Sequence, residues 1–119
     1  MPPPLSPLLS DLSSARQALV RLCQSTNYGH IEDLAVRDRD PVFPDPQCLV
    51  LVDVKLDAAE IQRPEVADSD FVLCTEVGRL MTLLDTIQDG KIARLEVRAG
   101  IPRRIILERR TQEVASVST

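Results

Sequence analysis

The chain contains one thirteen-residue pattern twice, 61 residues apart. Residues 29–41 read GHIEDLAVRDRDP, and residues 90–102 read GKIARLEVRAGIP. Both segments fit the frame G-x-I-x-x-L-x-V-R-x-x-x-P without a gap. A pattern that recurs at a fixed spacing is typical of one supersecondary unit used twice. We therefore predict a duplicated unit, and this constrains the architecture far more than the activity.

The composition predicts a single domain with an aliphatic core. The 119 residues suit one domain, and 44% of them are hydrophobic, which is ordinary for a globular protein. Aromatic residues make up only 3% and Trp is absent, so few side chains could stack on bases or sugars. The net charge of -4 also disfavours a nucleic-acid footprint over the whole surface.

The sequence indicates neither a membrane span nor secretion. No apolar run approaches the roughly 18 residues that a spanning helix needs, and the start, MPPPLSPLLSDL, lacks the basic and apolar regions of a signal peptide. Cys23, Cys48 and Cys74 are odd in number and form no CxxC pair, so we expect reduced thiols rather than a disulfide framework or a zinc site. We predict a cytoplasmic protein without a cofactor.

Apolar spacing predicts two helices. The first begins at Ser6-Pro7, where serine caps and proline opens a helix, and it ends near Thr26, before Asn27-Tyr28-Gly29. The second runs from Ser69 or Asp70 to Gln88, before Asp89-Gly90. The expected apolar faces comprise Leu12, Ala15, Leu19, Leu22 and Cys23 in the first helix, and Phe71, Cys74, Val77, Leu80, Met81, Leu84 and Ile87 in the second.

Four strands are predicted, at residues 31–37, 48–56, 91–99 and 103–110. The order is therefore α-β-β-α-β-β, two αββ units in tandem. The first half of segment 48–56 is apolar on both faces, which is typical of a central strand or of one that a partner covers. For the last two strands we expect Leu95 to pair with Leu107 and Val97 with Ile105, joined by the loop 100–102.

Both copies of the pattern share one irregularity. Ile92 precedes Leu95 by three residues, as Ile31 precedes Leu34, and in a regular strand such residues lie on opposite faces. Either both strands contain a bulge, or both isoleucine side chains wrap under the end of the preceding helix.

The two copies differ in charge. Residues 91–110 contain seven basic and two acidic side chains, a net charge of +5, whereas residues 30–60 contain three basic and eight acidic side chains, a net charge of -5. In the predicted hairpin Arg94 faces Glu108 and Arg98 faces Arg104, with Arg103 beside the turn. Like charges directly opposed are destabilising, so something could compensate for them.

Three interpretations of this basic hairpin stay open. It is a solvated tip, or it contacts an acidic protein surface of the first copy or of a second subunit, or it binds an anion such as nucleic acid. The candidate binding residues are Arg94, Arg98, Arg103 and Arg104.

Catalytic motifs are scarce. His30 is the only histidine and follows Gly29 directly, a position more typical of an exposed or capping side chain than of a catalytic one. The four glycines form no phosphate-binding loop, and no pair of carboxylates is marked by its spacing. We predict no enzyme, and an enzyme that uses His30 with carboxylates ranks last.

The arrangement of a helix, an aromatic-Gly pair, I-x-x-L-x-V-R and a second strand resembles small uncharacterised bacterial proteins of unknown function. NYGHIEDLAVRDRDPVF is its most specific part. The resemblance covers about residues 18–56, and again 79–108 without the aromatic residue. It implies a bacterial cytosolic protein and transfers no active-site residues.

We therefore expect an α+β domain over residues 8–110, between a disordered proline-rich start, 1–7, and a disordered tail, 111–119. Two units, about 8–56 and 69–110, would form a four-stranded, mainly antiparallel sheet with two helices on one face. The function expected first is a non-enzymatic protein-interaction module, able to self-associate into a dimer. The alternative is anion or nucleic-acid binding through the basic C-terminal hairpin.

Overall fold

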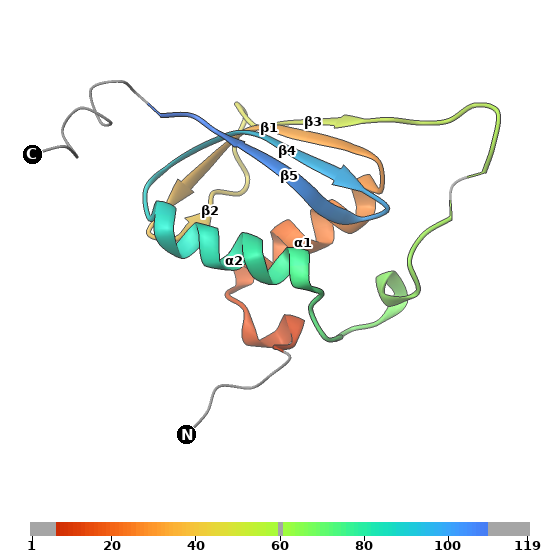
Figure 1. The fold of residues 1–119 in the computed structure, drawn as a ribbon, viewed down its shortest axis with the longest axis horizontal. Helices are drawn as coiled ribbons and strands as arrows, with labels where there is room; N and C mark the ends of the chain where they lie inside the picture. Colours follow the sequence, from red (N-terminus) through yellow and green to blue (C-terminus); the bar gives the residue numbers. More distant parts are fainter. Residues whose placement is uncertain (1–6, 60, 110–119) are drawn as a thin grey trace, which may run out of the picture.

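Two α-helices and five strands form the framework of the described part of the chain, residues 7–59 and 61–109, in the computed structural model (Figure 1). Single 3₁₀ turns at Leu9–Asp11 and Pro64–Ala67 precede the helices. The disorder expected for residues 1–7 and 111–119 concerns segments that, apart from Pro7, lie outside the described residues. In chain order the elements are α1 (Ser14–Thr26), β1 (Gly29–Arg37), β2 (Asp40–Pro41), β3 (Leu49–Val52), α2 (Thr75–Ile87), β4 (Gly90–Arg98) and β5 (Ile101–Leu107).

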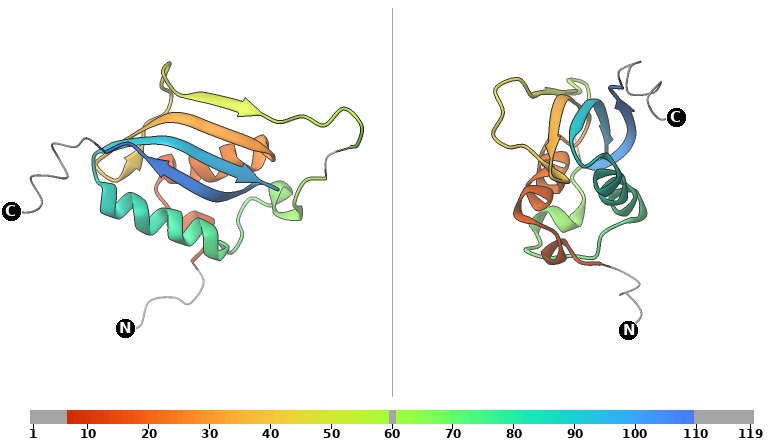
Figure 2. Two further views of the ribbon diagram at one scale, coloured as in Figure 1. Left: turned by 45° about the horizontal axis from the view of Figure 1, so that its top comes forward. Right: turned by 90° about the vertical axis from the view of Figure 1, so that its left-hand side faces the viewer.

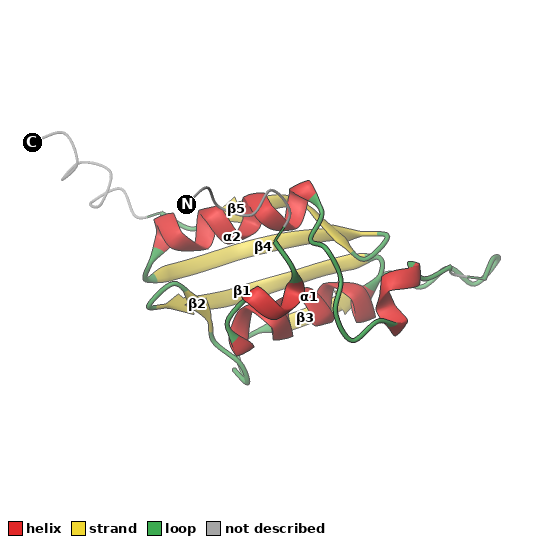
Figure 3. Ribbon diagram, turned by 90° about the horizontal axis from the view of Figure 1, so that it is seen from below, coloured by secondary structure: helices red, strands yellow, loops and turns green. Residues whose placement is uncertain are grey.

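The strands form one curled antiparallel sheet, and both helices pack against the same face of it (Figure 2). The strand order is β2-β1-β4-β5, and β3 pairs with the first half of β1, on the side where β2 pairs with its end. Seen from below, α1 lies near β1 and β3, and α2 runs along β4 and β5 (Figure 3). The predicted α+β class with two helices on one face is confirmed, with five strands in place of four.

An aliphatic core fills the space between helices and sheet. β1 contributes Ile31 and Leu34, and β4 contributes Ile92 and Leu95, all at most 1% exposed. A bulge in each strand brings these residues to one face: Asp33 has a φ of 58°, and β4 shifts its register against β5 directly after Ile92. The register shift confirms the bulge interpretation for β4, and the positive φ of Asp33 supports it for β1.

The 61-residue spacing of the sequence pattern also separates equivalent parts of the backbone. α1 and α2 begin 61 residues apart, and so do β1 and β4. β1 and β4 pair with each other in the middle of the sheet, with Gly29 opposite Val97 and Val36 opposite Gly90. If each residue of one strand is replaced by its counterpart 61 positions away in the other strand, the same set of pairs results, so the pairing is symmetric.

Two reciprocal hydrogen bonds join each tight turn to the end of the helix in the other half. The Arg39 amide, in the turn after β1, donates to the Gln88 carbonyl over 2.8 Å. The Gly100 amide, in the turn after β4, donates to the Asn27 carbonyl over 2.8 Å. Asn27 and Gln88 end their helices with φ values of 62° and 60°. The helices therefore end on these residues, and Gly29 opens a strand instead of stopping the helix.

Helix α1 begins later than predicted. The Ser13 hydroxyl accepts a hydrogen bond from the Arg16 amide over 3.2 Å and caps the helix, a role that we had assigned to Ser6. Ser6 itself lies outside the described residues, and Pro7 lies in an extended segment before the 3₁₀ turn.

Helix α2 also begins later, at Thr75 instead of at residues 69–70. The residues before it run beside the start of the chain, where the Leu9 amide donates to the Phe71 carbonyl and the Leu73 amide to the Pro7 carbonyl, both over 2.9 Å. Because these backbone groups are satisfied by another segment, the helix has no need to extend over them.

The β4–β5 hairpin has a tighter turn than predicted. Arg98 pairs with Ile101, so the turn consists of residues 99–100, with φ values of 54° and 75°. A type I′ turn requires positive φ at both central residues, and its twist matches that of the flanking strands. After a register shift between Glu96 and Val97, Leu95 pairs with Ile105. The predicted pairs Leu95–Leu107 and Val97–Ile105 and the predicted loop 100–102 are wrong.

Strand β3 lies at an edge, so the interpretation of segment 48–56 as a central strand is wrong. Only Leu49–Val52 of that segment is strand. The two-residue β2 takes the place directly after β1 that we had assigned to segment 48–56, and the element order is α-β-β-β-α-β-β. The other interpretation, that a partner covers β3, stays a prediction.

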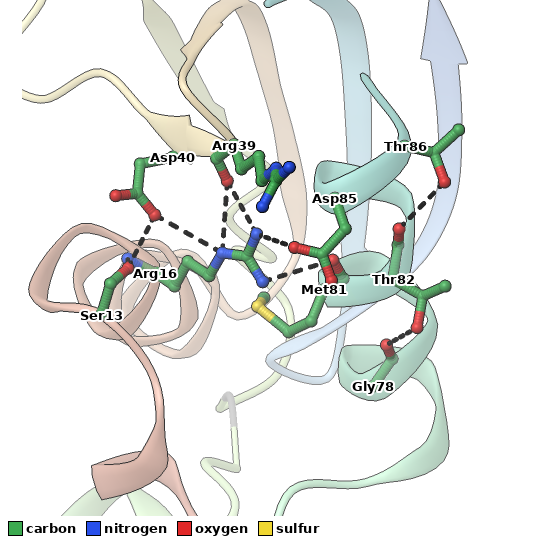
Figure 4. Close-up of polar contacts among 9 residues, drawn as sticks. All are labelled: Ser13, Arg16, Arg39, Asp40, Gly78, Met81, Thr82, Asp85 and Thr86. Carbon is green, nitrogen blue, oxygen red and sulfur yellow. Dashed lines mark hydrogen bonds and ion pairs between the residues drawn. The ribbon is translucent and has the colours of Figure 1, made fainter. Parts of the chain in front are cut away.

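The Arg16 guanidinium joins α1, α2 and the turn after β1 (Figure 4). It donates to the Arg39 carbonyl from Nε over 3.2 Å and from Nη2 over 2.9 Å, and to the Met81 carbonyl from Nη1 over 3.4 Å. Nη2 also lies 2.6 Å from Asp85 Oδ1, and Nε lies 3.5 Å from Asp40 Oδ1. The side chain is only 13% exposed, so it is a clamp between the layers and not a surface charge.

We expect Arg16→Met to lower the free energy of unfolding by about 1.5–3 kcal/mol, because hydrogen bonds from a charged donor contribute that much. Methionine keeps most of the apolar stem and removes every donor. Urea denaturation followed by circular dichroism measures the change. Arg79→Met is the matched control, because Arg79 is exposed on α2 and makes no hydrogen bond or ion pair with the described residues. Equal losses in the two variants would contradict the clamp.

Gly29→Ala tests the contact between β1 and β3. A Cβ at Gly29 would lie 2.0 Å from the Leu51 carbonyl oxygen, and the φ of 153° strains any other residue. We expect a loss of about 1–3 kcal/mol and faster amide exchange in β3, read by thermal denaturation and hydrogen exchange. At Gly90 a Cβ would meet only the end of the Ile87 side chain, at 3.1 Å, so Gly90→Ala is the control. The idea fails if both variants are equally stable.

Candidate interaction surface at the β3 edge

The largest group of exposed apolar side chains lies on β3 and the residues that follow it. Leu49, Val50, Leu51 and Val52 are 37–54% exposed. Val54 and Leu56, in the segment that follows the strand, are 60% and 96% exposed. We call residues 49–56 the β3 edge. Contiguous exposed apolar surface of this kind usually marks an interaction site.

One side of the β3 edge holds its backbone to β1. The Asp53 amide donates to the Tyr28 carbonyl over 2.7 Å. Along an antiparallel strand, hydrogen-bonding groups point alternately to one neighbour and to the other. The amides and carbonyls of Val50, Val52 and Val54 therefore point away from β1, and no other strand of the described residues pairs with them. The β3 edge thus offers free backbone groups together with apolar side chains.

The end of the β3 edge extends away from the body of the domain. In Figure 1 the chain after β3 runs outward beyond the ends of β1 and β4 before it returns towards α2. The Lys55 ammonium lies 5.7 Å from the centre of the ring of Tyr28, the residue before β1 whose carbonyl also accepts from the Asp53 amide. Residues 53–56 are consequently accessible to another chain from several sides.

The sheet face opposite the helices carries two cross-strand rows. One row is Leu49, Glu32, Arg94 and Ile106, and the other is Leu51, His30, Glu96 and Arg104. An ion pair links the two charged residues of the first row, with 3.1 Å between Arg94 Nη2 and Glu32 Oε2. His30 Nε2 lies 3.7 Å from Glu32 Oε2. His30 is thus half-buried and lies between the charged Glu96 on one side and the apolar Leu51 of β3 on the other.

The four candidate arginines line one open hollow of about 790 Å³ at the tip of the β4–β5 hairpin. Arg103 Nη1 lies 2.5 Å from Glu76 Oε2, and Arg104 Nε lies 3.8 Å from Glu96 Oε2. Arg98 pairs through its backbone with Ile101. The expected opposition of Arg98 and Arg104 is wrong. The two-residue turn places Arg98 opposite Ile101, and a register shift between Glu96 and Val97 then places Glu96 opposite Arg104.

The opposite charges of the two halves meet in the middle of the sheet. Arg94 is paired with Glu32, as described above, and Lys91 Nζ lies 3.4 Å from Asp33 Oδ1. The expected partner of Arg94, Glu108, lies 3.8 Å from Lys91 instead. Acidic side chains of β1 therefore neutralise two of the basic side chains of β4, within the same chain.

Sequence reasoning did not identify the β3 edge as an edge, although it recognised that both faces of the segment are apolar. The missing information was the position of β2. Asp40 and Pro41 pair with Arg37 and Val36 only, which leaves the first half of β1 for β3. A two-residue strand that contains a proline has almost no pattern to recognise.

Comparison of the chain with protein-family models, with curated proteins and with solved structures found no match. The resemblance to small bacterial proteins therefore stays a prediction. Among the described residues, no helix is long and apolar enough to cross a membrane. The same residues contain no group of three or more His, Cys, Asp or Glu side chains that could hold a metal ion.

Thiol labelling tests the packing beneath β3. Burial raises the pKa of the Cys23 thiol to about 12, so the reactive thiolate is strongly disfavoured at pH 8. Burial, with Asp45 and Asp33 nearby, also raises the pKa of Cys48. We expect iodoacetamide to leave Cys23 unmodified in the native protein and to modify it in urea, as read by peptide mass spectrometry. Native labelling of Cys23 at the unfolded rate would contradict the packing.

Proposed function

We propose that this protein is a non-enzymatic protein-interaction module whose β3 edge binds an extended strand of another chain. Addition of a strand to a sheet edge is a common mode of peptide recognition, in which backbone hydrogen bonds provide affinity and alternate side chains provide specificity. The observation that carries the proposal is the free edge itself, with outward backbone groups at Val50 and Val52 between exposed apolar side chains.

The other edge strand of the sheet, β5, supports this proposal because it has features that prevent pairing with another chain and that β3 lacks. β5 is also an edge strand, but it contains Pro102, which has no amide to donate, and the charged Arg103 and Arg104. Proline and charge are the usual means by which natural sheets prevent pairing with other chains. β3 has the sequence LVLV and none of these features. An unprotected apolar edge is a liability unless a partner occupies it.

We further propose that the chain consists of two αββ units, about residues 8–56 and 69–110, and that the β3 edge arose where they differ. The shared 61-residue spacing of sequence pattern, helices, strands and reciprocal hydrogen bonds supports duplication. In the second unit β5 pairs with β4 from Ile92 to Arg98, whereas in the first β2 pairs only with Val36 and Arg37. The uncovered part of β1 accepts β3, which then presents its own free edge.

Anion or nucleic-acid binding through the basic hairpin is the second candidate, because all four arginines line one hollow. Three of them, Arg94, Arg103 and Arg104, already have carboxylate partners, so an anion would have to displace those partners. Glu96 and Asp53 also line the hollow and repel negative charge. The β3 edge requires no such rearrangement, and we favour it for that reason.

Selection from a library of displayed random nine-residue peptides tests the proposed function. We expect enrichment of extended, β-branched peptides that bind the wild-type protein and do not bind Val52→Pro. Proline at residue 52 removes one outward amide and leaves the β1–β3 ladder intact, because edge strands tolerate proline where the amide faces solvent.

The control for this selection is the stability of the Val52→Pro variant, which should melt within a few degrees of wild type. Two results would count against the proposed function. One is a selection that enriches no peptide. The other is a set of peptides that bind wild type and Val52→Pro equally, because these would occupy a surface other than the β3 edge.

A further inference from the structure

We propose that the strand bound by the β3 edge is the β3 edge of a second copy of this chain, paired antiparallel and centred on Val54. This inference rests on the proposed function and names its partner. It follows from the sequence of residues 52–56, Val-Asp-Val-Lys-Leu, in which an acidic and a basic residue flank a central valine and apolar residues flank both.

The backbone permits this register. The outward-pointing groups of β3 belong to Val50 and Val52, and Val54 follows the Asp53 amide, which still bonds the Tyr28 carbonyl. Leu56 lies at a bend beyond the strand, so the chain straightens there when the two copies pair. In a two-fold pair centred on Val54, each Val54 faces its own copy and each Val52 faces Leu56 of the other copy. Residues with outward-pointing groups therefore face one another, as an antiparallel ladder requires.

The charges select this register over its neighbours. Centring on Val54 places Asp53 of each copy opposite Lys55 of the other, which makes two opposite-charge pairs. Centring on Asp53 or on Lys55 would oppose like charges. Centring on Leu51 or on Val52 would place Asp53 opposite a leucine. Among these five registers only one pairs the charges, and opposite-charge cross-strand pairs stabilise a sheet whereas like-charge pairs destabilise it.

The side chains then separate by polarity. Val50 lies opposite the buried Ile31, so the helix side of the sheet receives Val52, Val54 and Leu56 from both copies. The other side receives the two Asp53–Lys55 pairs. In the isolated chain these three apolar side chains are 52%, 60% and 96% exposed, so pairing removes from water the most exposed apolar part of the β3 edge.

The position of the segment makes the contact sterically accessible. The chain that follows β3 runs outward beyond the ends of β1 and β4, away from both helices (Figure 1). Leu56 lies at a bend in the isolated chain. When two copies pair, this part of the chain straightens, and one Val52–Leu56 pair is added at each end of the ladder between them. The result is one continuous antiparallel sheet through both copies, with their two-fold axis at Val54.

A charge exchange tests the register. In solution, we expect the wild-type chain to form dimers between micromolar and millimolar concentration in sedimentation equilibrium. Asp53→Lys and Lys55→Asp alone should each weaken the dimer about tenfold or more, because each creates two like-charge pairs. The double variant Asp53→Lys/Lys55→Asp restores both pairs and should restore the dimer. An equimolar mixture of the two single variants should form a mixed dimer, since each then supplies the charge that the other lacks.

Both substituted residues, Asp53 and Lys55, are exposed, and melting temperatures close to wild type confirm that the variants fold. A wild-type chain that stays monomeric at millimolar concentration overturns the inference. The inference is also overturned if the single variants dimerise as strongly as wild type, or if an equimolar mixture of the two single variants forms no mixed dimer. If the chain is monomeric while displayed peptides still bind in the manner that Val52→Pro abolishes, the proposed function stands and its partner is a different protein. If both experiments fail, both proposals fall.

Discussion

The pairing of β1 with β4 is the constraint on which the rest of this structure depends. The two strands carry the fully buried side chains of the sheet, and each ends in a tight turn whose amide bonds the end of the helix that precedes the other strand. A helix end, a turn and a strand register are therefore fixed together on each side. If the register slipped by one residue, Ile31 and Ile92 would leave the core and both turn-to-helix bonds would be lost.

This central pair leaves two outer edges, and the chain treats them differently. β5 continues directly from the turn after β4 and closes one side with a proline and two arginines. On the other side β2 stops after two residues, the chain makes a loop, and β3 returns to cover the first half of β1. The free β3 edge is thus a consequence of how the first half ends its hairpin. The two cross-strand rows on the face opposite the helices show the same difference between the edges. At β3 both rows end in a leucine, whereas at β5 one ends in Ile106 and the other in Arg104.

The sequence allowed the core face, the approximate helices and the bulged strands to be predicted, because these depend on local spacing of apolar residues. The 61-residue recurrence indicated the positions of the helices and of β1 and β4 for the same reason, because it too consists of locally spaced apolar residues. The turns were harder. Asp38, Arg39 and Ala99 all adopt positive φ. Aspartate tolerates this conformation better than most residues, but arginine and alanine rarely adopt it, so their sequence does not indicate the turn as glycine would. Because the turn sets the register of the hairpin, a turn at residues 99–100 instead of 100–102, together with the shift between Glu96 and Val97, displaced the predicted partners of Arg94 and Arg98 by two and three residues. The position of β3 could not be predicted, because an apolar strand at an unprotected edge has the same pattern as a central one.

The loose attachment of β3 has a consequence for how the molecule fluctuates. None of its four residues is buried, and it is held by one ladder to β1 and a cation over one tyrosine ring. The fully buried side chains belong to α1, α2, β1 and β4, so detachment of β3 would expose little of the core. Segments of this kind open far more often than the whole domain unfolds. The strand that carries the free edge is therefore also the part of the sheet that can adjust its twist to another chain while the remaining strands stay in register.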